Sequence, residues 1–276
     1  MAPPLNLQTL SDLRISCTAV AKPTVADDAA RISFGTTCMD TPLGGGLTRP
    51  ALHEVFATCG ADAATATGFA VAVAIRAAED RPVVWVRQDF SSAETGSIYP
   101  PGLKELGLDP TRLILVRARN AVDVLKAGAE AARCSSLAMV LIEPWGAHRV
   151  IDLTASRRLS LAAQASKTPT LLLQTAAEPV ASAAETRWQI SALPSRALEA
   201  NAPGYPAFKV KLLRHRGGLD AQEWSVEWNR DKRHFQERIQ HDRTADIRPA
   251  IPRPLVSVSA DRQTATGAYV PLRRTG

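Results

Sequence analysis

The sequence predicts an α/β fold with a mostly parallel β-sheet flanked by helices and a C-terminal antiparallel hairpin extension. Between residues 51 and 173, short apolar segments alternate with segments of helical periodicity, a pattern typical of βαβ units. From about residue 187, strand-like segments follow one another without intervening helices. The chain has 276 residues, of which 45% are hydrophobic and 22% charged, so it is long enough to bury a sizeable core.

The N-terminal part predicts a short amphipathic helix followed by a polar linker, together spanning residues 1–34. Leu5, Leu10 and Leu13 lie at near-helical spacing after two prolines. These leucines could dock on the core of a neighbouring protein, or they could pack against the core of their own chain.

The alternating region begins with a turn at the glycines 44–46 and a strand at 51–56. An Ala-rich helix follows at about 64–79, because Phe69, Val73 and Ala77 share one helical face. Gly107 is a helix stop signal and Asn120 a helix N-cap. Further strands are predicted at 82–86, 112–116, 137–142 and 170–173, and further helices at 100–107, 120–133 and 152–166.

The second pattern predicts consecutive strands at 187–191, 207–213 and 223–228. Gly217 and Gly218 supply the permissive backbone of a hairpin between the last two strands. In the last strand, Trp224, Val226 and Trp228 alternate with Glu223, Ser225 and Glu227, which predicts one buried and one wet face. The pattern then decays, so we expect a core over 35–230 and a largely disordered tail over 231–276.

Charge is unevenly distributed along the chain. The formal net charge is +6, and residues 230–276 hold ten basic and five acidic residues, against 23 and 22 in the rest. The basic tail indicates an anionic partner such as nucleic acid, or only a solvated appendage.

Several classes of protein are excluded by what the chain lacks. The four cysteines form no C-x-x-C pair, and Ala57 breaks a His-Glu-x-x-His pattern at His53, so we expect no metal site. Without a run of about eighteen apolar residues or a signal-peptide pattern, we expect no membrane span and a cytoplasmic location.

The segment from 57 to 65 lies where a phosphate-binding loop joins the first strand to its helix. No G-x-x-x-x-G-K-[ST] pattern can be drawn through Gly60, Asp62, Ala63 and Thr65, and no lysine occurs between Lys22 and Lys104. Asp62 would place a negative charge where phosphates would lie. The sequence therefore favours a vestigial loop that binds no cofactor over an unorthodox nucleotide site.

These segments resemble the recombinase RecA over about residues 35–230. A Gly-rich turn (Leu43 to Arg49) leads into Leu52-His53-Glu54-Val55-Phe56, and a gapless comparison places the family's P-loop lysine on Ala63 and the glycine before it on Asp62. The strand ending at Glu143 resembles the Walker B strand, and Thr170–Gln174 the strand after it. Glu143 without phosphates is a poor Mg²⁺ site.

One family fits these features better than RecA itself. A RecA-like core with an unusable P-loop, a short leading helix and a basic tail resembles the ImuA family. The resemblance implies a non-catalytic accessory protein of SOS-induced translesion DNA synthesis. It also implies three partners: RecA, the polymerase-like protein ImuB and an error-prone replicative-type DNA polymerase.

Two basic segments are candidate contacts with a partner or, weakly, with DNA. In the hairpin, strand alternation sends Lys209 and Lys211 to one face and Arg214 to the other, and the resemblance places Arg214 and Arg216 on basic positions that reach a neighbouring RecA subunit. A solvated face is the alternative. The tail spacing of Phe235 and Ile239 predicts a short helix that forms on a partner. The remaining tail candidates are Arg230, Lys232, Arg233 and Arg238.

Other functions stay open at this point. A divergent RecA-family ATPase would hydrolyse ATP, a cell-division inhibitor of the SulA type would bind FtsZ, and a plain DNA-binding module would bind in a strongly salt-dependent way.

Overall fold

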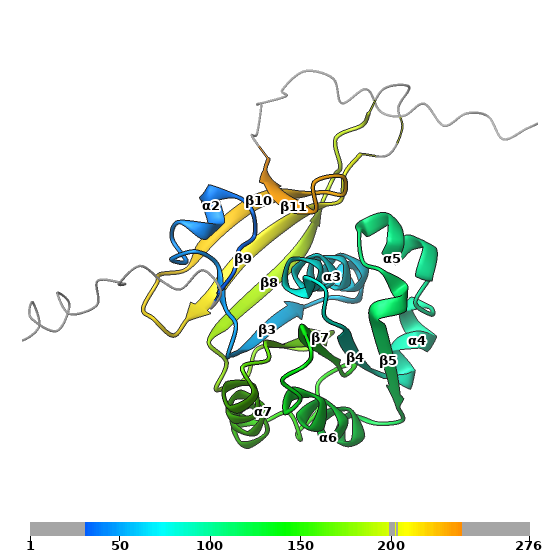
Figure 1. Cartoon of the computed structure of the whole chain (residues 1–276), viewed down its shortest axis with the longest axis vertical. Coiled ribbons are helices and arrows are strands. Elements are labelled where there is room, and N and C mark those ends of the chain that lie inside the picture. The colour runs from blue at the N-terminus through cyan, green and yellow to red at the C-terminus, as the bar shows by residue number, and fades with distance from the viewer. Residues whose placement is uncertain (1–30, 199–201, 203, 239–276) are drawn as a thin grey trace, which may run out of the picture. The chain divides into compact units, whose positions relative to one another are not determined.

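The computed structural model describes residues 31–238, except 199–201 and 203. A nine-stranded sheet forms the centre of this part of the chain, in the strand order β11-β10-β9-β8-β3-β7-β6-β4-β5 (Figure 1). The predicted N-terminal helix and the residues beyond 238 lie outside the described residues.

The sheet is parallel in the middle and antiparallel at one side, which confirms the predicted fold class. The parallel strands are β3 (Leu52–Ala57), β4 (Val83–Gln88), β5 (Leu113–Ala118), β6 (Met139–Glu143), β7 (Thr170–Thr175) and β8 (Thr186–Leu193). The antiparallel extension consists of β9 (Ala207–His215), β10 (Gln222–Asn229) and β11 (His234–Glu237).

Helices cover the two faces of the parallel part. On one face lie α3 (Ala63–Ala78) and α5 (Pro100–Leu106), and on the other lie α6 (Ala121–Ala132) and α7 (Leu153–Ser166) (Figure 1). As predicted, Asn120 caps α6 by accepting the Asp123 N–H, and Gly107 ends α5 in the left-handed region. Two short helices were not predicted: α2 (Thr37–Asp40) and α4 (Asp89–Thr95).

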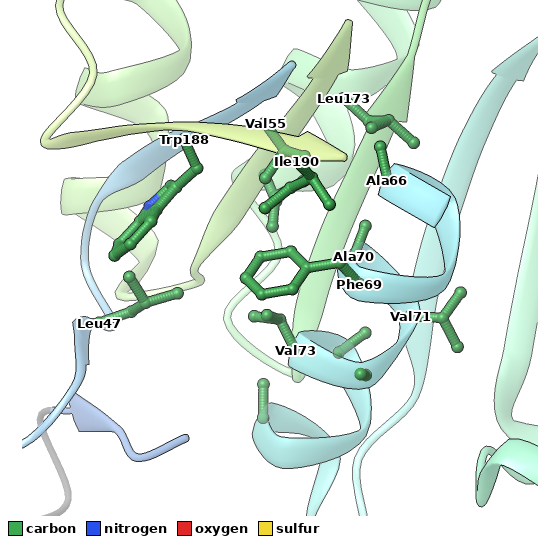
Figure 2. Packing of buried hydrophobic residues seen from close by; sticks show 14 of the residues in the cluster. Leu47, Val55, Ala66, Phe69, Ala70, Val71, Val73, Leu173, Trp188 and Ile190 are labelled. Carbon is green, nitrogen blue, oxygen red and sulfur yellow. The ribbon is translucent and has the colours of Figure 1, made fainter. Parts of the chain in front are cut away.

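Helix α3 is the apolar centre of the core. Phe69 projects from it toward Val55, Trp188 and Ile190 (Figure 2), and its ring is 1% exposed. By length and composition alone, the stretch Gly60–Ala78 is long and apolar enough to cross a membrane. The buried residues of α3 pack on the sheet, so burial in the protein core explains the apolar composition of this stretch.

The glycines 44–46 form the predicted turn, and all three have a positive φ. A Cβ on Gly46 would lie 2.1 Å from the carbonyl oxygen of Ile32, so only glycine fits there. The turn brings β2 (Leu47–Thr48) against β1 (Arg31–Ile32). Ile32 and Phe34 are buried, so this end of the predicted 1–34 linker belongs to the core.

The sheet also extends beyond the predicted core boundary at residue 230. Strand β11 pairs with β10, and Phe235 is fully buried against Phe34, Phe69 and Trp228, with ring centroids 5.6, 5.3 and 5.0 Å apart. The prediction of a partner-induced helix at Phe235 is therefore wrong, because this residue belongs to strand β11 and its side chain packs inside the aromatic core. Its proposed companion, Ile239, lies outside the described residues.

Candidate functional site

The segment between β3 and α3 folds back onto strand β8. Residues Gly60–Asp62 form a single 3-10 turn, and Ala63 begins α3. One carboxylate oxygen of Asp62 accepts the backbone N–H of Ala192 at 2.9 Å, and the other accepts the Cys59 thiol at 3.2 Å. Asp62 therefore ties the loop to the neighbouring strand.

This geometry differs from that of a phosphate-binding loop at each of the four loop positions named from the sequence. Asp62 places its carboxylate at the start of α3, where the positive end of the helix dipole would otherwise attract a phosphate. Ala63, onto which the lysine of the RecA family falls, is 1% exposed. Gly60 has an ordinary φ and open space around its Cβ position, and Thr65 lies in the first turn of α3.

Glu143 ends strand β6 and is bound entirely by protein groups. The Arg87 Nε lies 3.1 Å from both carboxylate oxygens, and the Trp85 Nε1 donates a hydrogen bond at 2.9 Å. Burial raises the pKa of Glu143, and the Arg87 charge opposes that rise. Both carboxylate oxygens accept hydrogen bonds from protein groups and only 1% of the residue is exposed, so Glu143 is poorly placed to bind Mg²⁺.

Arg87 also holds helix α4 against strand β4. Its terminal nitrogens donate to the carbonyl of Gly96, at 2.8 Å, and to the side chains of Ser92 and Thr95, which hold α4 against β4. Arg87 was not among the residues predicted from the sequence. The signal for Arg87 was its position directly after the apolar strand predicted at 82–86, since an arginine that continues a buried strand requires a carboxylate partner.

A second buried ion pair joins strand β8 to strand β3. The Arg187 Nε donates to the Glu54 carboxylate at 2.8 Å, and the guanidinium lies 5.2 Å from the Phe56 ring centroid. Burial raises the pKa of Glu54, while hydrogen bonding by Ser182 and the charge of Arg187 lower it. This pair was also missed, because it joins residues 133 positions apart.

The predicted face of Arg214 is wrong, because strand β9 contains a bulge. Leu212 pairs with Trp188, and Arg214 pairs with Arg187, so Leu213 has no partner. The extra residue reverses the alternation and brings Arg214 to the Arg187 side. There it donates to the Ser182 carbonyl at 3.1 Å.

The hairpin lysines are exposed, as strand alternation predicts. Lys209 pairs with Glu223 on β10 at 3.0 Å. Among the described residues, neither Lys211 nor Arg216 forms an ion pair, and Arg216 lies in the turn after β9. Lys211 and Arg216 are therefore the hairpin cations most available to a partner.

The other basic candidates do not form one cluster with the hairpin. The Arg230 guanidinium lies 5.8 Å from the Tyr205 ring centroid, and Arg238 pairs with Glu227 at 3.5 Å. This pairing also explains why Glu227, predicted on the wet face of β10, is only 7% exposed. Lys232 and Arg233 lie in the turn between β10 and β11.

No group of three or more potential metal ligands occurs among the residues that the structure describes. The carboxylates predicted as candidates are each committed elsewhere: Glu143 to Arg87, and Asp62 to Ala192. The described part of the chain therefore offers ion pairs and exposed cations at the positions that the sequence indicated.

The sheet order and its flanking helices define a RecA-like fold. The crystal structure of the RadB recombinase superposes with a TM-score of 0.53 and 17% identity, over 75% of this chain and 99% of that one. No model of a protein family matches the sequence. Protein ImuA of Caulobacter vibrioides, in the strains NA1000 / CB15N and ATCC 19089 / CIP 103742 / CB 15, is 33% identical over 217 residues. The match covers 70% of this chain and 84% of each relative, and the chain belongs to the ImuA family.

Proposed function

We propose that this chain is a non-enzymatic accessory protein of damage-induced translesion DNA synthesis, active in the cytoplasm. Membership of the ImuA family supports the pathway. A RecA-like fold that lacks a lysine at the start of α3 supports the absence of ATP turnover. In this view the chain keeps the shape of a recombinase subunit and uses its outer surfaces.

The hydrogen bond between Asp62 and the Ala192 N–H is the observation that carries the proposal. This hydrogen bond holds the Asp62 carboxylate at the start of α3, where a nucleotide phosphate would otherwise lie. A triphosphate there would meet this negative charge without a lysine to neutralise it, and phosphoryl transfer depends on charge neutralisation.

Contacts with RecA, ImuB and an error-prone replicative-type polymerase form the second part of the proposal. Two exposed cations of the hairpin support a contact with RecA, because Lys211 and Arg216 form no ion pair among the described residues. Arg214 is a weaker candidate than the sequence indicated, since it donates to the Ser182 carbonyl. The hairpin cations would meet acidic residues of a RecA subunit.

A capture experiment tests this contact. Immobilised wild-type protein would retain RecA, and the variant Lys211→Ala/Arg216→Ala would retain several-fold less, because two cations of the interface are lost. The control Lys126→Ala/Arg157→Ala removes the same charge from exposed positions on α6 and α7 and should capture RecA as wild type does. Unchanged capture by the hairpin variant would refute the interface.

Strains that lack the gene or carry it on a complementing copy test the pathway. Deleting the gene should lower the frequency of mutations after DNA damage, and the wild-type and control chains should restore it. An unchanged frequency in the deletion strain would refute the role in mutagenesis. Co-sedimentation with polymerising FtsZ would instead favour a cell-division inhibitor, and strongly salt-dependent DNA binding without RecA capture would favour a DNA-binding module.

A further inference from the structure

A cavity of about 750 Å³ opens at the end of α3 that is remote from Asp62. Its walls come from four segments that lie far apart in the sequence: the end of α3 with the following turn, the end of α5, the 3-10 turn Pro110–Arg112 with the residue before it, and the turn before β11. The volume lies within the range of small-molecule sites.

The lining of this cavity is strongly cationic. Six basic side chains face three acidic ones, whereas residues 1–229 as a whole are almost neutral. The acidic residues are already paired: Glu79 with Arg49, which is not part of the lining, and Asp80 and Asp109 with Arg112. Within the described part of the chain, the other five cations have no carboxylate partner, namely Arg76, Arg81, Lys104, Lys232 and Arg233.

Stabilisation of helix ends explains only part of this charge. Arg76 and Lys104 lie in the last turns of α3 and α5, where a cation interacts favourably with the helix dipole. Arg76 also donates to the carbonyls of Ser33 and Arg233. Lys232 and Arg233 come from a turn between strands, so no helix end accounts for their position.

The turn is itself built to present these cations. Asn229 accepts the backbone N–H groups of Asp231 and Lys232, at 3.1 and 2.9 Å. Arg233 has a φ of 52°, a value uncommon for a residue with a side chain. Its side chain lies against Gly107, where a Cβ would come within 3.2 Å of it. The side chain of Arg233 is thus packed against the end of α5 at the wall of the cavity.

We propose that this cavity binds a phosphate-bearing ligand, with Lys104, Lys232 and Arg233 as its principal contacts. Unpaired cations that converge on one concave site favour an anion of multiple charge, and phosphate accepts hydrogen bonds from both lysine and arginine. The phosphates could belong to a nucleic-acid backbone or to a free nucleotide or pyrophosphate. The site is separate from the loop at Asp62 and independent of the function proposed above.

Two probes distinguish these sources, each applied to the full chain and to the variant Lys104→Ala/Lys232→Ala. The first is binding of a labelled oligothymidylate, measured by fluorescence anisotropy over a salt series. The second is the melting temperature in pyrophosphate or ATP, against sodium chloride of equal ionic strength. The control Lys126→Ala/Arg157→Ala loses the same charge outside the cavity.

If the ligand is a nucleic-acid strand, the cavity variant should reduce the salt slope of log K by about 1.4, because each lost contact contributes about 0.7. If it is a free phosphate compound, the ligand should raise the melting temperature of the wild type and control and leave that of the cavity variant unchanged. Equal effects of the two double variants, or no response to either probe, would overturn the proposal. The capture of RecA by the cavity variant is measured as well, because that result tests the proposed function independently of phosphate binding.

Discussion

At the scale of single residues, the charged groups inside this protein are committed to one another. Glu143 binds Arg87 and Trp85, and Glu54 binds Arg187. A buried ion pair costs desolvation free energy that its own attraction repays only with good geometry, so the loss of one partner is severe. Glu143 therefore contributes to the fold, whatever its resemblance to a catalytic residue.

The substitution Glu143→Gln tests this structural role. It leaves the Arg87 guanidinium buried without a countercharge, and we expect the free energy of unfolding to fall by about 3 kcal/mol. Urea denaturation measures the change. The exposed ion pair between Glu130 and Arg133 at the end of α6 offers a control, because Glu130→Gln should change the free energy of unfolding by less than about 1 kcal/mol. A Glu143→Gln variant as stable as the control would contradict the account.

His53 predicts a dependence of stability on pH. Its Nε2 donates to the Thr48 carbonyl at 2.9 Å, and its Nδ1 accepts the Thr186 hydroxyl at 2.7 Å, so the neutral ring satisfies both nitrogens. Burial lowers its pKa from 6.5 to about 4. The unfolded chain thus binds a proton more readily, and the stabilising contribution is complete above pH 6.5 and lost as the pH falls toward 4.

This contribution amounts to about 3 kcal/mol between pH 6.5 and pH 4. The variant His53→Gln keeps polar atoms at the site and removes the titrating group, so its free energy of unfolding should fall less over this window than that of the wild type. Urea denaturation at several pH values measures the difference. Parallel curves for the two proteins would show that His53 is not buried in its neutral form.

At the scale of elements, local patterns located most strands and helices. Asn120 and Gly107 marked helix ends because capping depends on neighbours in the sequence. Strand β11 was missed because its four residues are stabilised by Phe34, Phe69 and Trp228, which lie far away along the chain. The bulge at Leu213 was missed because strand alternation carries no signal for an extra residue.

The substitution Phe235→Ala measures what β11 contributes. A fully buried aromatic side chain is lost and a cavity is left, so the free energy of unfolding should fall by about 3 to 5 kcal/mol. Phe90→Ala is the matched control, because Phe90 is 49% exposed and should cost much less. If the two variants were equally stable, residues 234–237 would not belong to the folded core.

At the scale of the whole molecule, the chain has a RecA-like fold and belongs to the ImuA family. The sequence predicted the fold and the altered loop, because a missing lysine and an added aspartate can be read from the sequence directly. It did not predict the ion pairs of Glu143 and Glu54 or the cationic cavity, because these join segments that meet only in three dimensions.

The central proposal is that this RecA-like core does not hydrolyse ATP. Its most direct test is steady-state ATP hydrolysis by the purified full chain, measured with Mg²⁺ in the presence and absence of single-stranded DNA. We expect phosphate release equal to that of buffer under both conditions. ATP turnover above that background, copurifying with the chain, would contradict the proposal. The contradiction would be complete if the substitution Asp62→Gly, which removes the negative charge at the start of α3, increased the turnover.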